Sequence, residues 1–464
     1  MRKFFKSLGI LLAAILGIVL MLLAMSIRTV DERPFRETEY WENTVNALDA
    51  KLDSLPDSEA GDLWAGAGKA GLTPPIGVPL AGYGNRDGAP SEGVHDSLYV
   101  RVIAVGNAEL STFIVGYDAL LLPPQIAREV ENEIQKKLGI ESEQIVFTAT
   151  HTHSGAGGWG NGWLEEQFAG PPDERIEIMF FDSTLVAIER ALQNQQPAAY
   201  RFGSIQTPRF IRNRLVGDKG SVDAELVYLS LQHAEKMIGL FVTYSAHATV
   251  LSARNTLFSG DYPGYLQRQL EAKLGGVTLF AASGLGSHGP RGEGDGFAKA
   301  EFIGAALADS LLAHLSDYSL DRTAALAHIR LPLELPRLQV RITQSLTLAP
   351  WLAKRLLKPG DAYIQLLMID DFIIAATPGD YSGELALDVK DVAEETGKMA
   401  TITSLNGGYI GYLTPSKYYP LNEYETRIMS WYGPFTGDLV TELIKRMIAG
   451  LSQNETTNLQ EFDE

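Results

Sequence analysis

The chain of 464 residues contains no cysteine and only eight histidines. The absence of cysteine excludes disulfide bonds and thiolate ligands, so any bound metal must use histidine, carboxylate or tyrosine side chains. Basic residues are also in the minority, because 39 lysines and arginines stand against 57 aspartates and glutamates, a formal net charge of −18. A surface of this charge repels phosphate backbones, which argues against nucleic acid as a partner.

Long apolar runs are scarce, and the one that stands out lies at the amino end. The basic segment 1–6 precedes uncharged residues 8–25, and Arg28 follows. This length nearly spans a bilayer core, and the positive flank favours an amino end inside and a body outside. We therefore predict that residues 1–28 are a signal anchor, in the membrane through residues 8–27, with the body on the exported (periplasmic or extracellular) side. A cleaved signal peptide is the alternative, with Ala24 and Ser26 as a weak site.

The rest of the chain divides into three predicted parts. Residues 29–65 are polar and carry apolar side chains three or four positions apart, at Trp41, Val45, Leu48 and Leu52. This spacing predicts an amphipathic helix, as a stalk or lying on the body. Residues 66–452 alternate strand-like and helical segments, which predicts a large single α/β domain of mixed β-sheets flanked by helices. The polar residues 453–464 are predicted to be a disordered tail.

The most informative stretch is 145–158, a β-branched and aromatic run that ends in His151-Thr152-His153 and a glycine-rich loop. Side chains alternate along a strand, so both histidines are expected on one face. The glycines let backbone approach whatever the histidines hold. One interpretation is a metal site at the mouth of an α/β sheet. The other is one histidine capping a loop and one packed in the core.

Three later strand-like runs also end in residues able to bind metal, namely His247, Asp380 and Tyr412. With His153 they form a mixed nitrogen and oxygen set, which suits Zn²⁺. Singly each has another explanation: a buried hydrogen-bonded histidine, a helix cap after Pro-Gly, or a core tyrosine.

The run Thr150-His-Thr-His-Ser-Gly-Ala-Gly-Gly resembles the signature of the neutral (non-lysosomal) ceramidases. Further landmarks over residues 66–450 follow a similar order: Gly82-Tyr83, Asn213-Arg214, His247, Ser259-Gly-Asp261, Pro378-Gly-Asp380 and Tyr412-Leu-Thr-Pro. That family is a family of zinc amidases. The resemblance therefore implies an exported, membrane-anchored, zinc-dependent amidase that hydrolyses the N-acyl bond of ceramide or a related N-acyl lipid.

The resemblance also implies roles for individual residues. The zinc ligands would be His153, His247, Asp380 and Tyr412. Tyr424 would stabilise the oxyanion formed when zinc-activated water attacks the carbonyl. Apart from the resemblance, we expect a loop or pocket group to return a proton to the leaving amine, with His151 and His288 as the candidates. Arg214 and Gly289 fall at positions of the substrate pocket.

This chain departs from the family pattern in three respects. Asp380 stands where the family has glutamate, and Glu384, one helical turn on, is an alternative ligand. Gly289 stands where the family has a serine assigned as nucleophile, which excludes a serine-acyl mechanism at that position. No immunoglobulin-like domain is expected after residue 452. The missing serine favours one alternative, a zinc hydrolase of another N-acyl or ester substrate. A non-catalytic membrane-anchored binding protein on the same scaffold is a second alternative.

Overall fold

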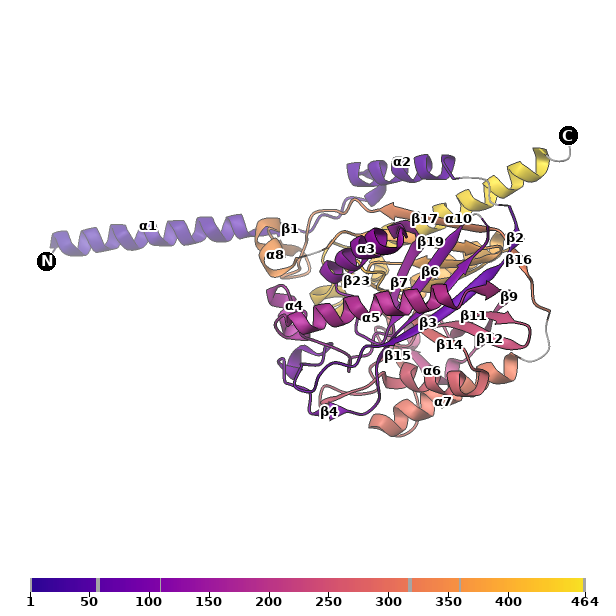
Figure 1. The fold of residues 1–464 in the computed structure, drawn as a ribbon. Helices are drawn as coiled ribbons and strands as arrows, with labels where there is room; N and C mark the ends of the chain where they lie inside the picture. Colours follow the sequence, from indigo (N-terminus) through magenta and orange to yellow (C-terminus); the bar gives the residue numbers. More distant parts are fainter. Residues whose placement is uncertain (1, 56–58, 109, 316–318, 359, 462–464) are drawn as a thin grey trace.

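A computed structural model describes residues 2–55, 59–108, 110–315, 319–358 and 360–461 of the chain. The body is built on three larger sheets with helices on their outer faces (Figure 1). The predicted mixed α/β architecture is confirmed. The strands form because their segments are rich in Val, Ile, Leu, Phe and Ala, which suit a pleated surface buried on both faces.

The first sheet has the order β7-β6-β5-β3-β8. Its strands are β3 (Trp64–Gly71), β5 (Tyr99–Gly106), β6 (Ser111–Tyr117), β7 (Ile145–Ala149) and β8 (Gln196–Pro197). Helices α3 (Pro124–Leu138) and α5 (Glu174–Gln193) supply the apolar residues that cover its outer face.

The second sheet has the order β14-β12-β11-β9 and the third the order β17-β19-β20-β22. The second consists of β9 (Ala199–Gln206), β11 (Glu225–His233), β12 (Lys236–Tyr244) and β14 (Val277–Ala282). The third consists of β17 (Leu326–Pro332), β19 (Tyr363–Ile369), β20 (Phe372–Ala376) and β22 (Met399–Thr403). Helices α6 (Asp261–Leu274) and α7 (Gly296–His314) pack on the second sheet. Helices α9 (Gly383–Glu395) and α10 (Thr436–Glu461) pack on the third.

One apolar cluster joins the inner faces of the three sheets. It includes Ile103 and Val146 of the first sheet, Phe241 of the second, and Leu367 and Ile374 of the third. Each sheet also contains one parallel pair, β6 with β7, β12 with β14, and β20 with β22. A backbone hydrogen bond from Ser404 N to Ala282 O links the third pair to the second, and the side chain of Thr148 in β7 donates a hydrogen bond of 3.3 Å to the carbonyl of Ser404. Loops leaving different sheets therefore meet at one place, where the candidate site lies.

The amino end consists of an apolar helix, α1 (Arg2–Ser26), that projects from the body (Figure 1). Its residues 4–26 are long and apolar enough to cross a membrane, with a mean hydropathy of 2.9 over an 18-residue window. Strand β1 (Ile27–Thr29) follows at once and pairs with β18 (Leu346–Leu348), just before the short helix α8 (Pro350–Leu356).

Helix α2 (Glu39–Asp53) is the predicted amphipathic helix. Of the two predicted placements, the structure shows the helix on the body, because Trp41 and Leu48 are buried in the cluster of the third sheet. At the other end, α10 continues through Glu461, into the segment predicted as a disordered tail. Residues 452–461 contain neither glycine nor proline to end it. Residues 462–464 lie outside the described part of the chain.

Candidate metal centre and pocket

Three histidines converge where the sheets meet. The Nε2 atom of His247 lies 3.0 Å from the Nε2 atoms of both His151 and His153, and the latter two atoms are 3.3 Å apart. All three side chains are buried. Burial lowers the pKa of His153 and of His247 well below the ordinary value, and nearby positive charge lowers it further. Neutral imidazoles with their nitrogens this close are a donor set that fits a metal ion.

Asp380 adds a carboxylate to this cluster. Its Oδ1 atom lies 3.2 Å from His151 Nε2, and its Oδ2 atom accepts a hydrogen bond of 2.6 Å from the hydroxyl of Tyr409. The side chain is fully buried, and Oδ1 accepts no hydrogen bond from the residues that the structure describes. A buried carboxylate oxygen without a donor is costly unless a cation satisfies it. The aspartate thus reaches the cluster despite being shorter than glutamate.

The two histidines of the His-Thr-His motif are held differently. His151 Nδ1 faces the carbonyl oxygen of Leu120 at 2.7 Å, which fixes the proton on Nδ1 and leaves Nε2 free to bind. His247 Nδ1 faces the carbonyl oxygen of Leu285 at 3.3 Å. Metal-binding histidines typically donate their second ring N–H in this way. His153 Nδ1, by contrast, has no hydrogen-bond partner among the described residues. His151 therefore has the supporting contact of a ligand, whereas the family resemblance assigns the ligand role to His153.

A turn, rather than strand alternation, brings the two rings together. Strand β7 ends at Ala149, and His151 has a φ of 58° in the left-handed region. This backbone conformation is costly for a residue other than glycine and persists only where the surroundings enforce it. Gly82 leaves the space that His153 occupies, since a Cβ there would lie 2.6 Å from the imidazole.

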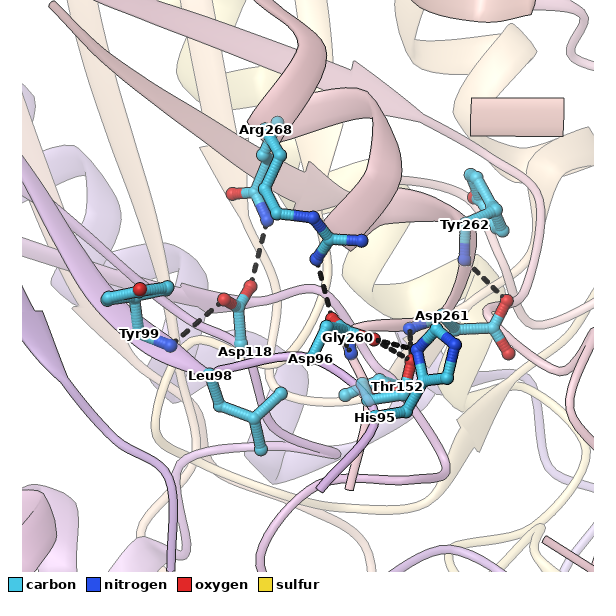
Figure 2. A network of polar contacts seen from close by, with 12 residues as sticks. His95, Asp96, Leu98, Tyr99, Asp118, Thr152, Gly260, Asp261, Tyr262 and Arg268 are labelled. Atoms are coloured by element: carbon cyan, nitrogen blue, oxygen red, sulfur yellow. Dashed lines mark hydrogen bonds and ion pairs between the residues drawn. The ribbon is translucent and has the colours of Figure 1, made fainter. Parts of the chain in front are cut away.

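A polar network behind the motif holds this turn in place (Figure 2). Thr152, between the two histidines, donates a hydrogen bond of 2.7 Å to the carbonyl of Ser259. Asp96 accepts from the amide of Gly260 at 3.0 Å and from Arg268 at 2.6 Å, which ties the start of α6 to the same loop. Asp261, also at this start, is buried, and burial raises its pKa to about 6.

Tyr412 stands in register with Asp380, because β21 (Asp380–Tyr381) and β23 (Tyr412–Leu413) pair in parallel. Its hydroxyl accepts a hydrogen bond of 3.1 Å from Arg214 Nη2. The Arg214 Nε atom in turn lies 3.1 Å from a carboxylate oxygen of Glu425. Burial, with Asp380 adding to it, raises the pKa of Tyr412 well above the ordinary value. The ring of Tyr424 packs edge-on against Tyr412, with centroids 5.7 Å apart.

The cluster forms the polar end of a pocket whose space, counted together with open solvent, is about 760 Å³. Its polar end is lined by His151, His153, Asp380, Tyr409, Tyr412 and Tyr424. Its wall is largely apolar, with Leu120, Leu121, Trp159, Leu164, Phe168, Leu356, Leu357, Met429 and Trp431. An apolar pocket that ends in polar groups suits a ligand that has an apolar tail and a polar head group.

Five sequence-predicted residues lie outside the pocket lining, namely His247 and Arg214, already described, and His288, Gly289 and Glu384. Both ring nitrogens of His288 are engaged, Nδ1 with Ser287 Oγ at 2.8 Å and Nε2 with the amide of Asp223 at 2.9 Å. Gly289 lies in β15 (His288–Pro290), and a Cβ there would touch only Arg214, at 3.5 Å. Glu384, the alternative ligand, accepts hydrogen bonds from Asn213 and Tyr418 instead.

Sequence reasoning missed Tyr409 as a partner of Asp380. The signal was weak, because a tyrosine between glycines in the segment 407–412 reads equally well as a loop residue. It also missed the carbonyl of Leu120, since backbone groups have no sequence signature.

The fold and the cluster together define a mixed α/β protein with a candidate metal centre at the end of an apolar pocket. The chain belongs to the neutral/alkaline non-lysosomal ceramidase family, whose N-terminal domain matches residues 64–305.

The chain is similar to two curated neutral ceramidases. It is 25% identical to that of Pseudomonas aeruginosa over 264 residues, which cover 53% of this chain and 38% of the relative. It is 24% identical to that of Mycobacterium tuberculosis over 233 residues, which cover 44% of this chain and 34% of the relative. The matched region thus spans little more than a third of each curated relative.

Two solved structures share the fold. The crystal structure of neutral ceramidase from Pseudomonas aeruginosa superposes with a TM-score of 0.71 at 20% identity, over 86% of this chain and 75% of that one. A structure described as ceramidase complexed with C2 superposes with a TM-score of 0.72 at 20% identity, over 86% and 76%.

Proposed function

We propose that this protein is a zinc-dependent amidase that hydrolyses the N-acyl bond of ceramide or a related N-acyl lipid. The observation that carries the proposal is the cluster of His151, His153, His247 and Asp380 at the end of an apolar pocket. The family and the names of the relatives supply the substrate class.

We propose His151, His247 and Asp380 as ligands, with Tyr412 completing the set. The backbone contacts of His151 and His247 and the donor-free oxygen of Asp380 support this choice. Bound zinc supplies an activated water at neutral pH and polarises the acyl carbonyl. In many metal sites a carboxylate or carbonyl group behind a histidine ligand fixes the orientation of its ring. Here the carbonyls of Leu120 and Leu285 lie behind His151 and His247 in this way.

The other residues of the pocket have distinct proposed roles. The apolar wall holds the acyl chain and excludes water from the reacting carbonyl. The hydroxyl of Tyr424 donates a hydrogen bond to the developing oxyanion, and Arg214 orients Tyr412 beside it. We propose that His153, which lines the pocket, returns the proton to the leaving amine. The engaged nitrogens of His288 argue against that role for His288.

We also propose that α1 is retained as a membrane anchor with the body on the exported side. Its last two carbonyls are bonded to the body, that of Met25 to the indole N–H of Trp351 at 3.1 Å and that of Ser26 to the amide of Ala349 at 2.8 Å. Cleavage after Ser26 would remove both acceptors. The intact mass of the protein purified from membranes tests the anchor.

The decisive experiment uses the purified full-length chain in detergent. Zinc content is measured first, and then turnover of a fluorescent ceramide before chelation, after it, and after zinc is restored. Asp380→Ala is the inactive comparison. Activity that disappears with the chelator and returns with zinc supports the proposal. A metal-free wild type overturns it in favour of a binding protein.

Gly289 favours one second candidate, because it stands where a family serine would be. That candidate is a zinc hydrolase of a different N-acyl or ester substrate. Turnover of an N-acylethanolamine, with ceramide left intact, would identify it.

A further inference from the structure

Helix α8 connects the foot of α1 to the pocket. Its first turn is tied to the apolar helix, since Trp351 bonds Met25 and β18 pairs with β1. Its other end supplies Leu356 and Leu357 to the pocket wall, next to Lys358. Helices α8 and α4 (Trp163–Ala169) lie side by side at the base of α1 (Figure 1). One short helix therefore spans the distance from the end of the candidate membrane segment to the pocket.

The exposed members of the pocket lining mark its mouth. Lys358 and Tyr424 are exposed, Leu164 and Leu356 are half-buried, and the histidine cluster at the opposite end is buried. A Cβ on Gly162 would contact the Lys358 side chain at 3.5 Å, so α8 and the start of α4 form one continuous rim. The mouth therefore lies on the face of the body from which α1 projects.

This rim has the composition of a membrane-interface surface. Trp351 is 47% exposed and Trp163 is 58% exposed. Lys354 and Arg355 are exposed beside them on α8. Tryptophan and basic residues are the side chains that settle at the boundary between headgroups and acyl chains.

The α8 part of this rim has a charge opposite to that of the whole molecule, whereas the α4 part carries Glu165 and Glu166. Residues 350–358 carry three positive charges and no negative one, whereas the chain has a formal net charge of −18. An anionic bilayer therefore repels most of the body and attracts α8, which orients the body on its anchor.

We propose that α8 and the start of α4 dock on the surface of the bilayer that holds α1, with Lys354 and Arg355 among anionic headgroups, so that the pocket mouth opens onto the membrane. This rests on the proposed anchor and deepens the proposed function, because it names the route of entry. A lipid with an apolar tail then enters the pocket from the same leaflet without crossing water.

Fluorescence quenching tests this docking without using turnover. Because the chain has no cysteine, single cysteines can carry a fluorophore at Trp163→Cys, Lys354→Cys and, as a control, Ala272→Cys near the far end of α6. The full-length protein is reconstituted into phosphatidylcholine vesicles containing phosphatidylglycerol. We expect headgroup-level doxyl lipid to quench probes at 163 and 354, and aqueous iodide to quench the probe at 272 several-fold more strongly than either.

A charge reversal tests the role of the headgroups. Lys354→Glu with Arg355→Glu, read by the probe at 163, should restore iodide quenching there. The matched control is Lys136→Glu with Lys137→Glu at the exposed end of α3. It changes the net charge by the same amount and should leave the iodide quenching of the probe at 163 unchanged. The proposal is overturned if probes at 163 and 354 are as open to iodide as the probe at 272, if the chain fails to float with the vesicles, or if both reversals act alike. A failed ceramide assay would leave these readings intact and would count against the proposed function alone.

Discussion

Nε2 of His151 and Oδ1 of Asp380 lie 3.2 Å apart, although the two residues come from different sheets. They meet because β7 and β20 pack against each other in the shared core, and the loops after both strands turn toward the same point. The contact brings a carboxylate oxygen that lacks a hydrogen-bond donor beside an imidazole nitrogen that is free to bind.

This contact predicts how metal binding divides between the two motif histidines. His151→Ala should lower zinc affinity by at least about 100-fold, since loss of supporting contacts alone costs about 10- to 100-fold. His153→Ala should lower it less and should reduce turnover more than zinc content. Metal analysis after dialysis measures the difference. His233→Ala, on an exposed strand end, is the control. If His151→Ala keeps its zinc and His153→Ala loses it, His153 is the ligand, as the family resemblance implies.

The proposed role of Tyr424 predicts a kinetic effect. Tyr424→Phe keeps the ring against Tyr412 and removes the hydroxyl, so kcat should fall by about 10²- to 10³-fold. KM and zinc content should change little. Steady-state kinetics with the fluorescent ceramide measure this, and Tyr265→Phe, outside the pocket lining, serves as the matched control. An equal loss in both variants, or a rise in KM alone, would contradict the role.

Two glycines of one loop predict opposite outcomes on substitution. Gly289→Ser should fold like the wild type, because its Cβ meets only ordinary contacts with Arg214. Turnover should stay within about twofold, and mass spectrometry should find no acyl adduct, since the chemistry does not rely on a serine there. Gly286→Ser should lower the melting temperature, because its Cβ would lie 2.3 Å from the carbonyl oxygen of Asp380. A faster variant with an acyl group on the new serine would contradict this prediction and would show that the pocket also supports a serine route.

Asp261 predicts a specific dependence of stability on pH. Burial raises its pKa from 3.8 to about 6. Between these values the folded chain holds a proton that the unfolded chain has lost, so this residue's contribution to stability falls as pH rises. The loss is on the order of 3 kcal/mol, complete above pH 6.

Asp261→Asn should remove this slope, and asparagine tolerates the left-handed backbone at this position. Urea unfolding between pH 4 and 7 measures the difference between variant and wild type. Comparing the two proteins is necessary because His288 also changes the stability with pH. Burial lowers the pKa of His288 to about 4, so its contribution to stability is lost as pH falls, and it cancels in the difference between variant and wild type. A difference that stays constant with pH would show that Asp261 does not titrate as described.

The parts of the fold and site that sequence could predict are those with local signals. The spacing of Trp41 and Leu48 predicts α2, and apolar runs ending in His247 and Asp380 place these residues at strand ends. The grouping of strands into three sheets around one core could not be predicted, because pairing depends on contacts distant in the chain.

The resemblance divides the roles of His151 and His153, but the contacts that hold each ring were beyond sequence reasoning. Alternation predicts two equivalent rings, whereas the left-handed turn at His151 gives them different partners. The carbonyl of Leu120, which distinguishes them, belongs to the backbone of a separate segment. Only the assembled structure places it.

The donors of the cluster are divided between the two halves of the chain. His151 and His247 lie inside the family-matched region 64–305, and Asp380 and Tyr412 lie beyond it, joined by a two-residue strand pair. Neither half alone holds the full set. A metal ion held by the proposed ligands would therefore tie the second sheet to the third, and any opening between these sheets would release it.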